Sequence, residues 1–466
     1  MSLIVSISGI RGIFGEGLNP ENIIHYTKTF SEYCKIRKKN GEKIKIIIGR
    51  DGRITGKIIA NIVSSTLISL GCDVVAIGVC PTPTVAIAVK NSDADGGISI
   101  TASHNPIEWN GLKFFNSDGM FLNSDDMKDF VKISESLSVQ YVNWDKLGRY
   151  ELDESWIQKH IELVLGLSYI NISKIREKKY RVVLDCINSS GGRIIPQLLK
   201  TLGCEVYEMN CELSGVFSRK PEPVPENLSE VMYKVKYLKA DLGIVVDPDV
   251  DRLVLITEKG EPYGEEYTIA TAVKFILGKK FNEKQKFKVV VNLSTTRAVE
   301  DIAYEYNSEV IRTPVGEINV STTMKKHNAI IGGEGSGGII LPEVHYVRDA
   351  VLGTVLILQM LTEFGGKLSE LKETMPEYFI TKDKLGIKDL NADDCLKLLK
   401  KRYEHEKINV DDGLKIDFVD RWVHLRKSNT EPIIRIIAEA KSEMMAKKLV
   451  EDFKKEIYEL ATSQRK

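Results

Sequence analysis

Three aspartates at alternate positions stand out in the stretch "VVDPDVDR". In an extended segment Asp247, Asp249 and Asp251 would project to one face, and Pro248 disfavours helix at the residue before it. Carboxylates on one face repel each other unless a cation lies among them, and oxygen ligands without sulfur or imidazole favour Mg²⁺. The pattern predicts a magnesium site with Arg252 as positive charge for a phosphate beside it. A solvated acidic turn is the alternative.

A serine and a histidine stand side by side in "TASHNP", directly after an apolar run typical of a buried strand. A hydrolytic serine needs a positioned base, but neighbouring side chains of an extended chain point to opposite faces, so we expect no direct Ser103–His104 pair. No GxSxG surrounds the serine either. A serine at a strand end, followed by the turn former Asn-Pro and by Lys113, favours a loop that holds a phosphate.

The stretch "LRKSNTEPIIRI" concentrates hydrogen-bond donors in a loop that enters a strand. Arginine forks and hydroxyl groups at this density suit a dianionic phosphate. The alternative is an ordinary polar turn before an edge strand. The candidate phosphate-binding residues are Arg426, Ser428, Asn429, Thr430 and Arg435.

The glycine-rich stretch "GGEGSGGIILP" contains the pattern GxGxxG at Gly333, Gly335 and Gly338. A dinucleotide site would need a strand before the pattern and a helix after it. Here a second apolar strand follows, which argues against a dinucleotide. A glycine turn that brings Glu334 and Ser336 to a polyhydroxylated ligand is favoured, because carboxylates and hydroxyls bind sugar hydroxyls.

These loops need elements to position them, and the chain supplies a repeated unit. Segments 45–79, 181–209 and 288–316 each have the order strand, loop, helix, strand. Continuous Val/Ile runs are typical of strands buried on both faces of a largely parallel sheet. The tail after about residue 372 differs, because it alternates strands with turns and closes on an amphipathic helix.

The predicted fold class is therefore α/β, with three tandem α/β domains of mixed, largely parallel sheets and a C-terminal α+β domain around one central cleft. The expected domains are 1–150 with the Ser103 loop, 151–257 with the aspartates, 258–371 with the glycine loop and 372–466 with the basic loop.

Composition limits the classes of function. The chain has 466 residues, 65 basic and 65 acidic, so its formal charge is zero and no nucleic-acid or membrane surface is expected. Without a signal sequence or an apolar run long enough to span a bilayer, we expect a cytoplasmic protein. The seven cysteines form no CxxC pair and are expected to be buried free thiols. The sequence leaves the oligomeric state open.

Four motifs, "TASHNP", "DPDVDR", "GEGSGG" and "RKSNTEP", follow one another in this order. Together they resemble the α-D-phosphohexomutase superfamily, which includes phosphoglucomutase, phosphomannomutase and phosphoglucosamine mutase. The resemblance covers essentially the whole chain. Within the superfamily, "SGIRG", "TPVGEINV" and "HYVRDA" are most similar to phosphoglucosamine mutases of the archaeal and Bacteroidetes type.

The resemblance implies a role for each motif. It makes Ser103 the phosphoserine and a further ligand, with the three aspartates, of one Mg²⁺ per chain. The glycine loop would read the sugar, the basic loop would grip its phosphate, and Arg11 and Lys113 match basic residues beside the phosphoserine. One position departs from the family, because bacterial phosphomanno/phosphoglucomutases carry a histidine where this chain has Gly338. His345 is the candidate replacement, and an imidazole that caps the adjacent strand is the alternative.

The implied activity interconverts hexose 6-phosphate and hexose 1-phosphate through phospho-Ser103 and a hexose 1,6-bisphosphate, with glucosamine 6-phosphate as the expected substrate. Lys113 or His345 would handle the hydroxyl proton, and His104 is a loop residue that supports the phosphoserine or contacts substrate. Phosphomannomutase or phosphoglucomutase activity is the first alternative. A metal-dependent sugar phosphatase and a non-enzymatic sugar-phosphate binding protein are more distant alternatives.

Overall fold

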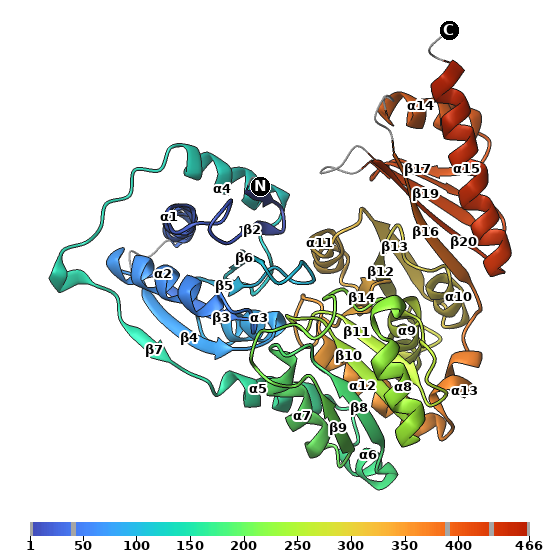
Figure 1. Ribbon diagram of the computed structural model, residues 1–466, viewed down its shortest axis with the longest axis horizontal. Helices are drawn as coiled ribbons and strands as arrows, with labels where there is room; N and C mark the ends of the chain where they lie inside the picture. Colours follow the sequence, from blue (N-terminus) through green and yellow to red (C-terminus); the bar gives the residue numbers. More distant parts are fainter. Residues whose placement is uncertain (1–2, 39–42, 387–391, 428–432, 464–466) are drawn as a thin grey trace.

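The structure is a computed structural model that describes residues 3–38, 43–386, 392–427 and 433–463. Within these ranges four β-sheets follow one another along the chain. Figure 1 shows the first sheet in blue and the fourth in orange and red on opposite sides, with the second and third sheets between them. The predicted class, three α/β units followed by an α+β unit, is confirmed.

The first sheet is mixed, in the strand order β1-β2-β6-β5-β3-β4-β7. The pairs β3–β4, β3–β5 and β4–β7 are parallel, and the pairs β1–β2, β2–β6 and β5–β6 are antiparallel. Its strands are β1 (Ile4–Ser6), β2 (Gly9–Ile13), β3 (Lys45–Arg50), β4 (Asp73–Val79), β5 (Gly96–Ile100), β6 (Trp109–Asn116) and β7 (Tyr150–Leu152). Its helices are α1 (Pro20–Arg37), α2 (Gly56–Ser69), α3 (Thr82–Lys90) and α4 (Ser124–Glu135), with the short 3₁₀ helix η1 (Trp144–Lys146).

The second sheet has the order β11-β10-β8-β9, with β8 parallel to β9 and β10 and with β11 antiparallel to β10. Its strands are β8 (Arg181–Asp185), β9 (Glu205–Met209), β10 (Leu242–Val246) and β11 (Leu253–Thr257). The helices of this part of the chain are α5 (Trp156–Leu165), α6 (Ile172–Lys178), α7 (Gly191–Thr201) and α8 (Ser229–Leu238), with η2 (Pro225–Asn227).

The third sheet repeats this arrangement in the order β13-β12-β14-β15, where only the β14–β15 pair is antiparallel. Its strands are β12 (Lys288–Asn292), β13 (Glu309–Thr313), β14 (Ile331–Glu334) and β15 (Gly338–Ile340). Its helices are α9 (Glu265–Lys280), α10 (Ala298–Glu305), α11 (Glu317–His327), α12 (Ala350–Phe364) and α13 (Leu368–Glu373).

The fourth sheet is antiparallel throughout, in the order β16-β20-β19-β18-β17. Its strands are β16 (Phe379–Gly386), β17 (Lys407–Asn409), β18 (Leu414–Asp417), β19 (Trp422–Lys427) and β20 (Ile433–Ala440). Two helices accompany it, α14 (Ala392–Arg402) and α15 (Glu443–Ser463). This part has a hydrophobic core of its own.

The repeat predicted from the sequence is confirmed as β3–α2–β4, β8–α7–β9 and β12–α10–β13. In each unit a further strand (β5, β10 or β14) runs parallel to the first, and the chain then returns along an antiparallel strand (β6, β11 or β15). The loops at these three reversals carry "TASHNP", "DPDVDR" and "GEGSGG". The three motifs therefore occupy the same place in three copies of one topology.

The first three units share one hydrophobic cluster that contains Ile47 of β3, Ile161 of α5 and Leu356 of α12. Helix α12 is buried along nearly its whole length, so it acts as a joint between units. All seven cysteines are free, as predicted; five are buried, whereas Cys204 and Cys211 are half-buried. Among the described residues, no helix combines the length and the apolar character that crossing a membrane requires.

Candidate active site

Ser103 lies in the loop between β5 and β6, and its backbone is in the left-handed region with φ 51°. Its Oγ is 3.2 Å from His104 Nδ1 and 3.4 Å from Asp247 Oδ2. The expectation that Ser103 and His104 would point to opposite faces is wrong, because that argument holds for extended backbone and the loop is not extended. Burial and the positive charge of Arg252 lower the pKa of His104, so its imidazole is neutral at pH 7.

Arg53 holds this loop in place, and sequence reasoning missed it. The guanidinium is 1% exposed and donates hydrogen bonds of 2.6–2.8 Å to the carbonyl oxygens of residues 103, 105, 106 and 109. Its Nε also donates to Asp51 Oδ2 at 3.1 Å. The only signal in the sequence was an arginine just after a buried strand, in "GRDGRITG".

The three aspartates lie in the loop that joins β10 to β11, and each is fully buried. One carboxylate oxygen from each lies within 4.8 Å of the others. The predicted convergence is confirmed, but its reason is different. The segment is a tight reversal with Val250 at φ 62°, not an extended strand with alternating side chains.

The donor atoms of this loop fit a hard divalent cation. Within the described part of the chain, Oδ1 of Asp249 and Oδ1 of Asp251 are buried and accept no hydrogen bond. Buried carboxylate oxygens without a partner are costly, and an all-oxygen set suits Mg²⁺. Burial and the charges of the other two aspartates raise the pKa of Asp247. A bound cation would offset this repulsion between the carboxylates.

Basic side chains surround the aspartates. Lys113 Nζ is 2.7 Å from Asp249 Oδ2, which also accepts a 2.7 Å hydrogen bond from Thr82 Oγ1 on α3. Arg252 Nε is 3.9 Å from Asp251 Oδ1. Burial lowers the pKa of Lys113, but the two carboxylates outweigh burial and raise it overall. Lys113 therefore places a positive charge beside the aspartates.

Arg11 of β2 lies beside the Ser103 loop. Its guanidinium donates to Asn105 Oδ1 at 3.1 Å, two residues from Ser103. Burial lowers the pKa of Arg11, yet an arginine keeps its charge in proteins. The residue thus adds a fixed positive charge near the serine.

The glycine loop joins β14 to β15, as the two-strand prediction required. Glu334 at its start is 5% exposed, and its Oε1 accepts hydrogen bonds from Asn292 Nδ2 and from the Gly316 backbone at 2.8 and 2.9 Å. Its Oε2 accepts from Arg348 Nη1 at 2.7 Å. Ser336 is half-buried at the reversal itself.

The glycines of this loop make room for protein atoms. A Cβ on Gly335 would lie 1.8 Å from Glu266 Oε2, and one on Gly337 would lie 2.4 Å from the Leu253 carbonyl oxygen. A dinucleotide fingerprint uses its glycines to bring backbone close to a pyrophosphate at the start of a helix. Here a strand follows, so the dinucleotide alternative has no structural support.

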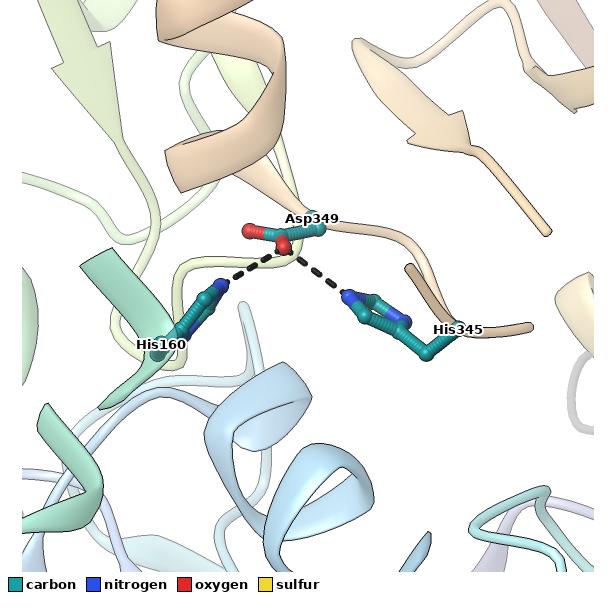
Figure 2. Close-up of side chains that lie close together, drawn as sticks. All are labelled: His160, His345 and Asp349. Carbon is teal, nitrogen blue, oxygen red and sulfur yellow. Dashed lines mark hydrogen bonds and ion pairs between the residues drawn. The ribbon is translucent and has the colours of Figure 1, made fainter. Parts of the chain in front are cut away.

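His345 lies away from these loops, in a buried cluster with His160 and Asp349. Figure 2 shows both imidazoles directed at one carboxylate oxygen of Asp349, at 2.8 Å from His160 Nε2 and 2.9 Å from His345 Nε2. The other nitrogen of His345 accepts a 3.1 Å hydrogen bond from the Val347 backbone. Both ring nitrogens are therefore engaged, and the geometry favours a structural imidazole over an acid/base or a sugar contact.

The same bonds argue against a metal in this cluster, although its three ligand atoms lie close together. Because the Val347 N–H points at His345 Nδ1, the proton of the neutral ring is on Nε2, where a metal would need a lone pair. Burial lowers the pKa of His345, which keeps the ring neutral. The cluster is a hydrogen-bonded joint.

In the fourth sheet, Arg426 and Arg435 are directly opposite each other on β19 and β20, and Lys384 of β16 is opposite Arg435 on its other side. Like charges on adjacent strands destabilise a sheet unless an anion lies on them. The three cations form what we call the basic strip, Lys384, Arg435 and Arg426. The predicted contacts Ser428, Asn429 and Thr430 lie outside the described residues.

Contacts connect the basic strip to the glycine loop. Arg426 Nε is 2.8 Å from Asp412 Oδ2, and that oxygen accepts a 2.9 Å hydrogen bond from the Val315 backbone of the third unit. The next residue, Gly316, donates to Glu334. Polar contacts through Asp412, Val315 and Gly316 therefore link the basic strip to the glycine loop.

Comparison with known proteins bears on this arrangement. The chain matches the phosphoglucomutase/phosphomannomutase alpha/beta/alpha domains I, II and III over residues 3–139, 158–260 and 264–378, and the C-terminal domain over residues 383–456. The chain belongs to the phosphoglucomutase/phosphomannomutase family. Its members are phosphohexomutases, and the four motifs of this chain fall within the matched segments.

Relatives of known name are similar along nearly the whole chain. A probable phosphoglucosamine mutase of Methanopyrus kandleri is 35% identical over 449 residues, with 96% of each chain covered. A phosphoglucomutase/phosphomannomutase of Thermococcus kodakarensis is 35% identical, with 97% of each covered. A phosphoglucosamine/phosphogalactosamine mutase of Sulfurisphaera tokodaii is 33% identical, with 98% of this chain and 99% of the other covered.

Solved structures of the family share the fold. A phosphoglucomutase/phosphomannomutase family protein from Burkholderia thailandensis superimposes with a TM-score of 0.83 at 24% identity, covering 97% of this chain and 98% of that one. A putative phosphomannomutase from Thermus thermophilus gives 0.81 at 22% identity, covering 98% and 99%. The four-unit architecture is thus that of the phosphoglucomutase/phosphomannomutase family.

Proposed function

We propose that the protein is a phosphohexomutase, and most specifically a phosphoglucosamine mutase, that moves a phosphate between the 6- and 1-positions of its sugar through phospho-Ser103. The observation that carries the proposal is the approach of Ser103 Oγ to 3.4 Å from Asp247 Oδ2, between residues 144 positions apart. In the proposed enzyme this contact would bring the phosphate carrier to the cation site. Relatives named as phosphoglucosamine mutases support the choice of sugar.

The proposed reaction has two balanced transfers. First the bond from phosphorus to Ser103 Oγ breaks while a bond to the free sugar hydroxyl forms, which gives a hexose 1,6-bisphosphate and releases the hydroxyl proton. The hydroxyl proton passes to the freed Ser103 Oγ. After the bisphosphate reorients, the bond between its other phosphorus and the sugar oxygen breaks while that phosphorus bonds to Ser103 Oγ, and the Ser103 proton passes to the freed sugar oxygen. Bound Mg²⁺, one per chain, would neutralise charge on the transferring group.

The chain's own residues supply the rest. Asp247, Asp249 and Asp251, together with the Ser103 phosphate, would hold the cation, and Lys113 and Arg11 would add positive charge beside it. Neutral His104, 3.2 Å from Ser103 Oγ, is placed to accept or return a proton there. We therefore propose His104 for the proton transfer, in place of Lys113 or His345, which were expected from the sequence.

Substrate binding is assigned to the third and fourth units. Glu334 and Ser336 would bind sugar hydroxyls, while Arg426 and Arg435, with Ser428, Asn429 and Thr430, would grip the phosphate that is not being transferred. Arg252 would neutralise a phosphate beside the cation. The supporting observation is the set of like charges on the basic strip. We also propose domain boundaries near residues 150, 257 and 371.

A side-by-side assay tests the activity. The purified protein, Mg²⁺ and a trace of hexose 1,6-bisphosphate are given glucosamine, glucose or mannose 6-phosphate, and both isomerised sugar phosphate and free phosphate are measured. A mutase forms the 1-phosphate with little free phosphate, and glucosamine 6-phosphate is expected to turn over fastest. Release of free phosphate as the main product would instead establish a phosphatase.

The mass of the intact protein tests the phosphoserine. Wild-type protein is expected to carry one phosphate that Ser103→Ala lacks, and Ser103→Ala is expected to be inactive. A protein that binds sugar phosphate, never carries phosphate and keeps normal binding in Ser103→Ala would be a binding protein and not a mutase.

A further inference from the structure

Arg348 contacts carboxylates from three different segments around the proposed site. Its Nη2 is 2.5 Å from Asp251 Oδ2, its Nη1 is 2.7 Å from Glu334 Oε2, and its Nε is 3.2 Å from Glu317 Oε2. The backbone N–H of Arg348 also donates to Glu317 Oε1 at 2.6 Å. The side chain is 9% exposed, so these contacts are made largely out of water. None of the roles proposed above involves this arginine.

Arg348 occupies one oxygen of Asp251 and one oxygen of Glu334. Oδ2 of Asp251 is taken by Arg348, while its Oδ1 accepts no hydrogen bond among the described residues. Oε1 of Glu334 is held by Asn292 and Gly316, and Arg348 takes the remaining oxygen. One planar guanidinium therefore fixes the rotation of both carboxylates, which a compact ammonium on a flexible stem would not do.

Gly338 makes room for this arginine. It lies directly opposite Glu334 in the β14–β15 pair, where a side chain would stand beside the Glu334 carboxylate. A Cβ at this position would be 2.2, 2.9 and 3.2 Å from Cδ, Cγ and Nε of Arg348, and these are its three nearest contacts. Gly338 is not among the glycines with positive φ, so its backbone would accept alanine. What excludes a side chain is Arg348.

We propose that Arg348 is a positioning residue that couples the aspartate loop to the glycine loop, and that Gly338 is glycine because Arg348 occupies the space beside it. The aspartate loop belongs to the second unit and the glycine loop to the third, so the arginine fixes the site across a junction between units. The functional part of this inference rests on the proposed function, since it takes Asp251 as a metal ligand and Glu334 as a sugar contact. The steric part does not.

The steric part is tested by a double-mutant cycle in thermal unfolding with Gly338→Ala, Arg348→Ser and the double variant. Gly338→Ala alone is expected to lower the unfolding midpoint by several degrees, because it displaces a buried guanidinium from three carboxylates. In the Arg348→Ser background the added methyl should cost little. Gly386→Ala is the matched control, because no atom of the described residues lies within 4 Å of its Cβ position and its φ is not positive. Equal losses from Gly338→Ala in both backgrounds would overturn the proposal.

The coupling is tested by Mg²⁺ titration calorimetry without sugar, on wild type, Arg348→Lys and Gly338→Ala. Lysine keeps the positive charge of Arg348 but lacks the two-pronged guanidinium. We therefore expect Arg348→Lys to bind Mg²⁺ roughly tenfold more weakly, because Asp251 is no longer held in orientation. Gly338→Ala should weaken Mg²⁺ binding in the same way, and this comparison stands even if Arg348→Ser does not fold. Wild-type affinity in both variants would refute the coupling, leaving Arg348 a purely structural residue.

Kinetics then separate the inference from the proposed function. Arg348→Lys is expected to lower kcat more than it raises KM, by roughly 10- to 100-fold in kcat/KM. A wild-type protein without mutase activity would refute the proposed function and would leave the unfolding cycle and the Mg²⁺ titration as they stand. An active wild type with additive unfolding losses would refute only the inference.

Discussion

At the scale of single residues, Arg53 shows how much of the site depends on a side chain that touches no reacting atom. It is buried and donates hydrogen bonds to three backbone carbonyls of the Ser103 loop and to the carbonyl of Trp109 at the start of β6. Buried carbonyls need donors, and Ser103 itself has a left-handed backbone that a non-glycine residue adopts only when its surroundings require it. Arg53 supplies donors to these carbonyls, and the Ser103 backbone N–H donates to Thr101 Oγ1 at 2.8 Å.

Arg53→Lys is therefore expected to destabilise the protein by about 3–5 kcal/mol, the usual loss when a buried charge network is broken. A single ammonium cannot replace a fork that also pairs with Asp51. Denaturant unfolding measures the loss. Arg50→Lys is the control, since Arg50 is half-buried and gives one hydrogen bond to the Asp51 carbonyl. Comparable losses in the two variants would show that Arg53 has no special role.

At the scale of elements, the same reversal of direction occurs three times, in β5–β6, β10–β11 and β14–β15. Each reversal follows a strand that is buried on both faces, and each presents a polar loop at the carboxyl end of a parallel strand, where α/β sheets bind ligands. The fourth sheet lacks this unit and supplies cations from three adjacent antiparallel strands. The proposed roles follow this division, with phosphoryl transfer on the loops of the first two units, sugar binding on the third and phosphate binding on the fourth.

Arg435→Gln is expected to raise KM for the sugar phosphate by about tenfold or more, with a smaller change in kcat, because the residue would contact a phosphate that is not reacting. Steady-state kinetics at fixed ionic strength measure both constants. Lys401→Gln is the matched control, since Lys401 is an exposed cation of the same unit on α14. An unchanged KM in Arg435→Gln would remove the basic strip from the binding site.

At the scale of the whole molecule, the cluster of His160, His345 and Asp349 ties three units together. Thr84 of α3 in the first unit is 2.9 Å from His160 Nδ1 on α5, and His160 bonds to Asp349 at the start of α12. The aspartate loop is held between the same helices, because Thr82 of α3 bonds to Asp249 and the Ala350 backbone of α12 bonds to the Val250 carbonyl. The helices α3 and α12 therefore contact both this cluster and the aspartate loop, and they hold that loop in position.

This joint predicts a pH dependence. Burial lowers the pKa of His345 below its ordinary 6.5, so the unfolded chain binds a proton that the folded protein does not. Stability from this group is present above about pH 6.5 and is lost as the pH falls below it. His345→Gln, which keeps a donor for Asp349 but cannot take up a proton, is expected to lose less stability than wild type between pH 6.5 and 5.

Thermal unfolding midpoints between pH 7.5 and 5 measure this difference. His405→Gln is the control, because His405 is 69% exposed in its side chain, and it should leave the pH dependence of wild type unchanged. Parallel curves for wild type and His345→Gln would show that His345 does not contribute to acid sensitivity.

The sequence by itself determined the repeated strand–helix–strand units, the strand after the glycine loop and the position of the motif residues in loops at strand ends. These depend on local patterns, namely apolar runs of strand length, turn-forming residues and the exclusion of helix before proline. Convergence of Asp247, Asp249 and Asp251 could also be predicted, because the outermost two are only four positions apart, although the predicted extended geometry was wrong.

Only the tertiary structure decided which distant groups meet. Ser103 and Asp247 lie 144 positions apart, Arg348 and Asp251 lie 97 apart, and no local pattern records either contact. The carbonyl of Ser103 accepts a hydrogen bond from Arg53, 50 positions earlier. The orientation of His345 depends on Asp349 and on His160 from another unit. Contacts of this kind come from the packing of whole units against one another, and short-range sequence patterns carry no information about that packing.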